Sequence, residues 1–450
     1  MVGPRTQEIG LRVVVVGTGH VGLITAASLA AIGHDVVGLD SDEEKIHGLR
    51  KGICPFYEPD LQALIDQTAN AGRLRFDAEP ADALKGAEVV FICVGTPARV
   101  SGEASLVALE RAIRSIAPSL SGPVVVVEKS TVPAGTADRL WRVLRLERPD
   151  LADRIEVVSN PEFLREGQAV EDALHPGRIL VGARSQRGFE TMRRLYEPLI
   201  RDGSDLIETD LPTAELAKHA CNAFLALKIS FANAMARLCE RAGADVTAVV
   251  DVMGSDPRIG RAFLDAGLGY GGYCFPKDLQ AFERLAARLG YDFPLLREVE
   301  RINGEAVDAT FDKVKDALWN LEDKRIALLG LSFKPNTDDV RFSPALALAR
   351  RLLDEGAAVV GYDPRAGANA KSELPELEVA SSADDAMGGA HCMVVCTDWD
   401  EFRSLDLRRA KSLLAHPIVV DGRNLFEPDE MKTAGFVYYG TGRALHRSAH

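Results

Sequence analysis

The residue best suited to covalent chemistry is Cys274, which closes a glycine-rich turn and is followed by Lys277 and Asp278. Four glycines within residues 267–272 let the backbone approach a ligand closely, because no Cβ stands in the way. A lysine beside a thiol favours the thiolate, which is the nucleophilic form. A buried structural cysteine is the alternative. The glycine cluster and the Lys-Asp pair favour a catalytic thiol.

A second site for chemistry is the G-x-G-x-x-G pattern of residues 17–22, which contains Gly17, Gly19, Val21 and Gly22. It follows an apolar run at residues 11–16, typical of a buried parallel strand, and precedes an apolar helical pattern. In this context the glycines admit a pyrophosphate, and the N-terminus of the helix favours its negative charge. The pattern therefore predicts a dinucleotide site.

The strand predicted at residues 35–39 ends at Asp40, at the spacing of a ribose-binding acid. Asp40 would accept hydrogen bonds from a ribose 2′-hydroxyl and repel a 2′-phosphate, so we expect NAD rather than NADP. Lys45 lies either near the same ribose or on an exposed helix surface.

Three further predicted strands each end in a polar turn that contains proline. The strands and turns are 88–94 with 95–97, 124–127 with 128–133, and 155–158 with 159–167. In doubly wound sheets, ligands bind beyond the carboxyl ends of the strands. The repetition therefore predicts that the three turns meet at one cleft.

A long helix is predicted in the middle of the chain, because residues 213–242 contain no Gly or Pro and repeat apolar residues at helical spacing. Lys218 and Asn222 share one face of it. Lys218 either extends to the surface or faces the cleft, where it would stabilise an oxyanion with help from Asn222. Arg258 is either a surface charge or a phosphate clamp.

The last third repeats a strand–helix–strand–acid layout at residues 324–330, 343–355 and 357–363, without the G-x-G-x-x-G pattern. The fold class we expect is α/β, with two Rossmann-like doubly wound domains joined by a central helical segment. The predicted domains are residues 1–212, 213–321 and 322–450. Cys392 and Cys396 lie in an apolar strand pattern and are expected to pack in the core, and we predict no metal site.

The bulk composition limits the partners. The 450 residues carry a net charge of −13, which argues against nucleic acid and against a basic membrane-binding face. No stretch approaches the ~20 apolar residues of a membrane helix. Seven scattered cysteines do not form a disulfide framework, so we expect a cytoplasmic protein with reduced thiols.

Taken together, these motifs resemble the UDP-glucose/GDP-mannose dehydrogenase family over residues 11–439. The resemblance rests on residues 17–22, 94–97, 130–133, 160–164 and 271–278, on Lys218 with Asn222, and on residues 421–423. His20 departs from the family pattern, since members often carry an aromatic residue there. We expect it to make backbone-level contacts at most.

The resemblance implies a four-electron oxidation of the C6 hydroxymethyl group of a nucleotide sugar to a carboxylate, with two NAD⁺ and one water. By the same similarity Cys274 is the nucleophile and passes through a thiohemiacetal and a thioester. Lys218 and Asn222 hold the oxyanion. Asp278 assists acid–base handling, and Glu162 and Thr131 orient the water.

The resemblance also implies which residues bind. Those expected around NAD are Asp40, Lys45, Thr96, Thr131, Glu166, Lys277 and Arg341, besides the glycine loop. Those expected around the nucleotide sugar are Glu162, Phe163, Leu164, Lys218, Asn222, Arg258, Phe263, Leu264, Gly271, Lys334 and Arg423. In the family, the position of Arg258 reaches in from a neighbouring subunit and the central helices form the dimer, so we expect a homodimer or a higher homo-oligomer.

The sugar itself is expected to be UDP-glucose, because residues 274–278 look like the glucose branch. GDP-mannose and a UDP-N-acetylhexosamine are the alternatives within the family. A two-electron dehydrogenase and a non-catalytic nucleotide-sugar sensor are the alternatives outside it. Cys274 argues against the first, and the full set of polar site residues argues against the second.

Overall fold

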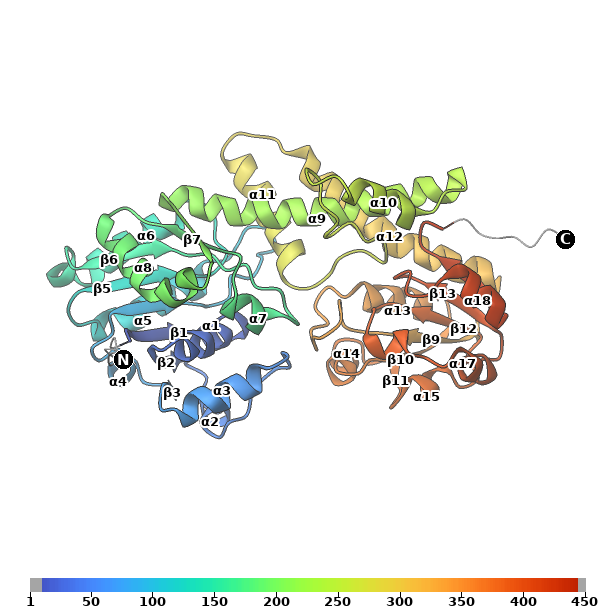
Figure 1. The fold of residues 1–450 in the computed structure, drawn as a ribbon, viewed down its shortest axis with the longest axis horizontal. Helices are drawn as coiled ribbons and strands as arrows, with labels where there is room; N and C mark the ends of the chain where they lie inside the picture. Colours follow the sequence, from blue (N-terminus) through green and yellow to red (C-terminus); the bar gives the residue numbers. More distant parts are fainter. Residues whose placement is uncertain (1–9, 444–450) are drawn as a thin grey trace, which may run out of the picture. The chain divides into compact units, whose positions relative to one another are not determined.

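The computed structural model describes residues 10–443. The chain forms two compact units, Met1–Ala220 and Cys221–His450, and helix α9 (Leu211–Ala242) runs from the first into the second (Figure 1). Each unit contains a largely parallel sheet, and the second also contains the long central helices. The predicted fold class is therefore confirmed. The domain boundaries at residues 212 and 321 stay a prediction.

The first unit is built on an eight-stranded sheet with the order β3-β2-β1-β4-β5-β6-β7-β8. The strands are β1 (Arg12–Val16), β2 (Asp35–Leu39), β3 (Leu74–Asp77), β4 (Val89–Ile92), β5 (Val124–Glu128), β6 (Ile155–Ser159), β7 (Arg178–Gly182) and β8 (Asp205–Thr209). The first six strands are parallel in the 3-2-1-4-5-6 order of dinucleotide-binding folds. The β7–β8 pair joins β6 in the antiparallel sense.

Helices cover both faces of this sheet, because its strands alternate apolar side chains toward two separate cores. Val13 and Val15 belong to the core under α1, α3 and α8, whereas Val14 and Val16 belong to the core under α5 and α6. The helices are α1 (His20–Ala31), α2 (Glu43–Arg50), α3 (Leu61–Asn70), α4 (Pro80–Ala83), α5 (Val107–Ile116), α6 (Thr136–Glu147), α7 (Ala169–Leu174) and α8 (Gln186–Arg201), with short 3₁₀ turns at Ala117–Ser119 and Pro149–Leu151. Burial on both faces explains why the strands read as continuous apolar runs.

The second unit repeats the strand order, as β11-β10-β9-β12-β13-β14, with every pair parallel. Its strands are β9 (Arg325–Leu329), β10 (Ala358–Tyr362), β11 (Glu378–Val379), β12 (Cys392–Val395), β13 (Ile418–Asp421) and β14 (Val437–Gly440). Its other helices are α10 (Val246–Gly254), α11 (Cys274–Arg288), α12 (Pro294–Leu318), α13 (Pro344–Asp354), α14 (Gly367–Glu373), α15 (Ala383–Met387), α16 (Asp400–Arg403), α17 (Leu407–Leu413) and α18 (Pro428–Ala434). The second Rossmann-like sheet predicted from residues 324–363 is confirmed.

The central helices α9, α11 and α12 pack through a small apolar cluster that includes Ala226, Tyr270, Leu279 and Val299. The long helix predicted at residues 213–242 is confirmed as α9. Within residues 10–443, no helix is long and apolar enough to cross a membrane.

Candidate active site

The turn between β1 and α1 has the geometry of an anion-binding loop. Gly17 and Gly19 form the turn, and Val21 and Gly22 lie in the first turn of α1. A Cβ on Gly22 would stand 1.8 Å from the carbonyl oxygen of Gly17, so only glycine allows this close approach. The amides at the start of α1 lack partners within the helix, which suits a pyrophosphate.

Asp40, at the end of β2, is held as a carboxylate. Its Oδ2 accepts hydrogen bonds from the amide and the hydroxyl of Thr18, both at 2.8 Å, and from Lys45 Nζ at 3.0 Å. Burial by itself would raise the pKa of Asp40, but these hydrogen bonds outweigh burial and lower it. Lys45 therefore lies beside the expected ribose-binding acid rather than on an unrelated surface.

The turns after β4, β5 and β6 are joined at one edge of the sheet. Thr96 Oγ1 donates to the carbonyl of Thr131 at 3.0 Å, and Lys129 Nζ donates to Asn160 Oδ1 at 3.0 Å. Because β4, β5 and β6 are neighbouring parallel strands, their carboxyl ends share this edge. The prediction that the three turns meet is confirmed.

Glu162, from the turn after β6, pairs with Lys218 of α9. The ammonium lies 3.0 Å from Glu162 Oε1, and the two side chains are only 8% and 5% exposed. Lys218 also lies over the Phe163 ring, 5.2 Å from its centroid. The alternative in which Lys218 extends to the surface is wrong, because the ammonium is buried against a carboxylate and an aromatic face.

In the second unit, Cys274 is the first residue of α11 and is exposed, so the alternative of a buried structural cysteine is wrong. A helix N-terminus favours negative charge on a thiol placed there. Asp278 lies four residues later on the same helix, one turn below the thiol.

The Asp278 carboxylate is buried between two partners. Its Oδ2 accepts a hydrogen bond from Asn222 Nδ2 at 2.7 Å, and its Oδ1 lies 2.6 Å from Lys277 Nζ. Lys277 and Arg341 both lie over the Tyr273 ring, at 5.5 and 4.5 Å from its centroid. The structure thus brings Asn222, Lys277, Asp278 and, through Tyr273, Arg341 together.

The glycines before Cys274 pack against protein rather than only leaving room for a ligand. A Cβ on Gly271 would stand 2.3 Å from the carbonyl oxygen of Phe342, and one on Gly272 would stand 2.7 Å from the Phe333 ring. The interpretation of these glycines as space for a ligand is therefore incomplete. They let this turn seat against the loops that follow β9.

The remaining candidates for nucleotide-sugar binding lie in different surroundings. Arg423 donates to the carbonyls of Cys396 and Phe333, and Lys334 lies 5.4 Å from the centroid of the Phe333 ring. Leu264 is 2% exposed in a hydrophobic cluster, so its side chain serves the core. Phe263 has a positive φ of 65°, and Arg258 is 88% exposed and pairs with Asp256.

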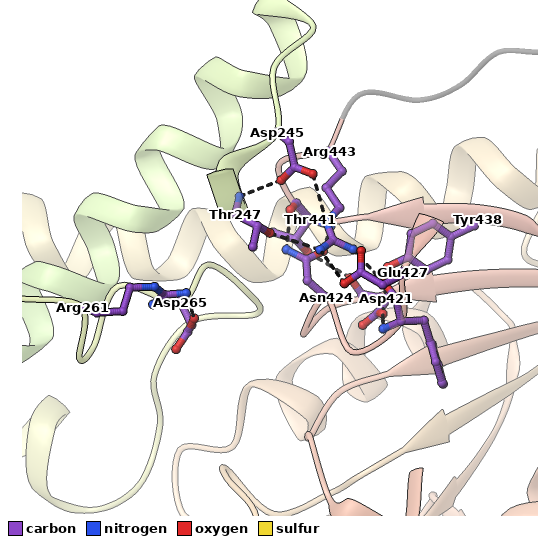
Figure 2. A network of polar contacts seen from close by, with 11 residues as sticks. Asp245, Thr247, Arg261, Asp265, Asp421, Asn424, Glu427, Tyr438, Thr441 and Arg443 are labelled. Carbon is purple, nitrogen blue, oxygen red and sulfur yellow. Dashed lines mark hydrogen bonds and ion pairs between the residues drawn. The ribbon is translucent and has the colours of Figure 1, made fainter. Parts of the chain in front are cut away.

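The loop that presents Arg423 is held by a polar network (Figure 2). Asp421 accepts a hydrogen bond from the Tyr438 hydroxyl at 2.9 Å, and both residues are labelled in Figure 2. It also accepts hydrogen bonds from the amides of Arg423 and Phe426, at 3.0 and 2.9 Å. Arg443 donates to the carbonyl of Phe426 at 2.7 Å. The end of the described chain thereby fixes the loop after β13.

Sequence reasoning missed several residues that organise these sites. Lys129 and Tyr196 both donate to Asn160 Oδ1, which starts the turn that carries Glu162. Burial lowers the pKa of Lys129 to about 8. Glu58 and Tyr273 were also missed. Lys129 and Tyr273 stand inside quoted motifs, whereas Glu58 and Tyr196 lie far from them in sequence and gave no signal.

The side-chain contacts of His20 differ from those that the sequence predicted. Its Nε2 lies 2.8 Å from Glu58 Oε2, and its ring packs on Phe56 with the centroids 5.1 Å apart. The expectation of backbone-level contacts is wrong, because a loop 38 residues away in sequence folds back onto the side chain.

Cys392 and Cys396 are buried in the core of the second sheet, as predicted, and burial raises the pKa of each to about 12. Among the residues that the structure describes, no three His, Cys, Asp or Glu side chains are grouped to hold a metal ion.

Comparison with known proteins identifies the family. Models of its NAD binding domain, central domain and UDP binding domain match residues 11–200, 212–305 and 327–428. The chain belongs to the UDP-glucose/GDP-mannose dehydrogenase family. It is accordingly an NAD-dependent enzyme, and the glycine turn, the start of α1 and the ionised Asp40 fit that cofactor.

Relatives within this dehydrogenase family match almost the whole chain. UDP-glucose 6-dehydrogenase from Rhizobium meliloti is 44% identical over 96% of this chain and 100% of its own length, and YwqF from Bacillus subtilis is 42% identical over 96% and 98%. The UDP-glucose dehydrogenase structure from Pyrobaculum islandicum matches with a TM-score of 0.89 at 35% identity, over 98% and 100% of the two chains. The UDP-D-ManNAc dehydrogenase structure from Pyrococcus horikoshii matches with 0.84 at 29%, over 96% and 99%.

Proposed function

We propose that this dehydrogenase oxidises UDP-glucose to UDP-glucuronate in two steps through a thioester on Cys274. The observation that carries the mechanism is the exposed Cys274 at the start of α11, one turn from the Asn222–Asp278–Lys277 group. A dehydrogenase that removes only two electrons has no use for such a nucleophile. The choice of UDP-glucose rests on the relatives at 42% and 44% identity, which are UDP-glucose 6-dehydrogenases.

In the first half of the reaction the C6 hydroxyl group loses a proton and C6 loses a hydride, which leaves an aldehyde. Bound NAD⁺ supplies the chemistry of accepting a hydride, once in each half. The Cys274 thiolate then adds to C6, and a C–S bond forms as the carbonyl oxygen becomes an oxyanion. The Lys218 ammonium and the Asn222 amide are the donors proposed to stabilise this charge.

In the second half the thiohemiacetal carbon loses a hydride and becomes a thioester. Water, oriented by Glu162 and Thr131, adds to the thioester carbonyl. The C–S bond breaks, the carboxylate is released and the thiolate is restored. Asp278 receives or returns a proton near the thiol. Each turnover removes two hydrides, which carry four electrons, from C6, and this equals the oxidation of an alcohol to a carboxylate.

The binding residues follow from the same proposal. We assign NAD to the loop of residues 17–22 with Asp40, Lys45, Thr96, Thr131, Glu166, Lys277 and Arg341. We assign the nucleotide sugar to Glu162, Phe163, Leu164, Lys218, Asn222, Arg258, Phe263, Leu264, Gly271, Lys334 and Arg423. The cations Lys334 and Arg423 of the second unit support a sugar diphosphate, which needs local positive charge in an acidic protein.

The stoichiometry of NADH tests the mechanism. We expect two NADH for each UDP-glucose consumed, and Cys274→Ser should reduce steady turnover by on the order of 10³-fold while leaving UDP-glucose binding intact. Cys54→Ser is the matched control, because Cys54 donates to the Phe56 carbonyl, a bond a hydroxyl can also make. One NADH per sugar, or full turnover by Cys274→Ser, would refute the thioester.

The choice of sugar is tested separately with a panel of UDP-glucose, GDP-mannose and UDP-N-acetylmannosamine at equal NAD⁺. The Pyrococcus horikoshii neighbour makes the last of these a real alternative. We expect kcat/KM to be highest for UDP-glucose. Turnover of another sugar without activity on UDP-glucose would overturn the substrate but not the chemistry.

We further propose that the enzyme is a homodimer formed by the central segment, residues 213–321. Phe224, Phe231 and Leu238 recur every seven residues along α9 and are 61%, 43% and 55% exposed. A regular exposed apolar stripe on a long helix favours association with a second copy.

A further inference from the structure

Glu58 connects two loops of the NAD-binding unit that lie far apart in sequence. Its side chain is fully buried, and Oε2 lies 2.8 Å from His20 Nε2. The same carboxylate accepts hydrogen bonds from the amide of Gly167 at 2.9 Å and from the amide of Ala169 at 2.8 Å. One carboxylate therefore ties the first residue of α1 to the segment that follows Glu162 and Glu166.

The position of His20 places its charge beside the cofactor loop. It is the first residue of α1, directly after the Gly19 N-cap, and α1 packs against α7 (Figure 1). Residues 17–22 contain no Lys or Arg, so His20 is the only side chain of the loop that can carry a positive charge.

The groups that face His20 are acidic. Glu58 bonds to it directly, and the charges of Glu166 and Glu162 also act on it. Burial would lower the pKa of His20, but the Glu58 hydrogen bond and these carboxylates together raise it above its usual value. The charge of Glu162 is paired with Lys218. Glu58 and Glu166 would still repel a pyrophosphate, and a protonated imidazole offsets part of that repulsion.

We propose that His20 and Glu58 form an ion pair that positions the NAD-binding loop and makes its affinity for the cofactor pyrophosphate depend on protonation of His20. Below the pKa of His20 the loop carries a positive charge and binds NADH more tightly. As pH rises through that pKa, the charge is lost and affinity falls. The inference rests on the assignment of NAD to residues 17–22.

The test is titration of the full-length protein with NADH from pH 6 to pH 9, followed by the change in cofactor fluorescence. We expect the Kd of the wild type to rise by on the order of three- to tenfold across this range, the size expected for one partly screened charge near a phosphate. His20→Gln keeps a hydrogen-bond donor without the charge and should bind weakly at every pH. His20→Phe keeps the packing on Phe56 and should behave in the same way.

His175→Gln is the matched control, because His175 and Asp202 form an exposed His–carboxylate pair at 3.5 Å in the same unit. It should reproduce the wild-type curve. Glu58→Gln should move the pH midpoint of NADH binding downward, because the imidazole loses its anionic partner. Circular dichroism at each pH establishes that every variant is folded.

Failure of the NAD-site assignment and failure of the His20–Glu58 proposal give different results. Asp40→Ala should weaken NADH binding at all pH values, and unchanged affinity in that variant would show that the cofactor site itself is misassigned. If Asp40→Ala weakens binding while wild type and His20→Gln have the same pH dependence, the His20–Glu58 proposal is overturned.

Discussion

At the scale of single residues, the central feature is the buried pair of Lys218 and Glu162, whose side chains are 5% and 8% exposed. Removing one partner of such a pair leaves an uncompensated buried charge, whereas removing both can be nearly neutral. A loss of activity in a single variant can therefore arise from the missing catalytic group or from destabilisation of the fold. A double variant separates the two.

We predict that Lys218→Met lowers the free energy of unfolding by ~3 kcal/mol and kcat by on the order of 10²- to 10³-fold. Lys218→Met with Glu162→Leu should recover most of the stability and none of the activity. Urea denaturation and NADH production measure the two effects. Recovery of activity in the double variant would show that Lys218 serves only the fold.

Glu128, at the end of β5, is fully buried near Glu215, and burial raises its pKa well above the usual value. Its folded state therefore holds a proton that the unfolded state releases above about pH 4.5. The contribution of Glu128 to the free energy of unfolding therefore falls as pH rises, by at most ~1.4 kcal/mol per pH unit. The decrease ends once the pH exceeds the pKa of Glu128 in the folded protein.

We predict that Glu128→Gln removes this pH-dependent decrease in the free energy of unfolding, because the amide does not titrate. The difference in unfolding free energy between Glu128→Gln and wild type should grow in favour of the variant from pH 5 upward. Parallel pH profiles for the two proteins, measured by urea denaturation, would contradict the assignment.

At the scale of elements, α9 performs two tasks with different faces. One face buries Lys218, His219 and Asn222, and the stripe of Phe224, Phe231 and Leu238 stays exposed. A helix of 32 residues is long enough to carry site residues in one part and an association surface in another. We expect the stripe to be covered by the same helix of a second chain.

We predict that Phe224→Glu with Phe231→Glu converts the protein from a dimer to a monomer in light scattering after gel filtration. Leu146→Glu is the control, since Leu146 is 81% exposed on α6 and does not belong to the α9 stripe. A variant that keeps the mass of two chains would place the subunit interface elsewhere.

At the scale of the whole molecule, the two sheets have the same strand order but differ in the loop that follows the first strand, β1 in one unit and β9 in the other. In the first unit, Asp40 contacts Thr18 and Lys45. In the second, Asp363 occupies the matching place and accepts hydrogen bonds from backbone amides, the Ser332 hydroxyl and Trp399, but it is buried, whereas Asp40 is partly exposed. A buried acid bonded in this way shapes its own loop, so we expect ribose binding in the first unit.

Hydrogen exchange with each ligand tests this division of labour. We predict that NADH slows exchange in residues 17–22 and 40–45, and that UDP slows exchange in residues 330–341 and 421–426. Protection should approach ~100-fold at a ligand concentration 100 times Kd, since binding adds about 2.7 kcal/mol to the opening free energy. Protection of residues 17–22 and 40–45 by UDP would contradict the assignment.

The sequence by itself determined the two Rossmann-like folds, the helix α9 and the meeting of the turns after β4, β5 and β6. These follow from short-range patterns: apolar runs, helical spacing, and glycines in a strand–turn–helix context. Parallel neighbouring strands bring their ends to one edge without any further information. The family followed from the same motifs.

Only the tertiary structure decided which partner each polar group meets. Glu58 reaches His20 across 38 residues, Tyr196 reaches Asn160 across 36, and Asp278 reaches Asn222 across 56. The glycines before Cys274 face Phe333 and Phe342 for the same reason. Contacts between distant segments depend on how the packed elements bring loops together, and no local pattern in the chain encodes that geometry.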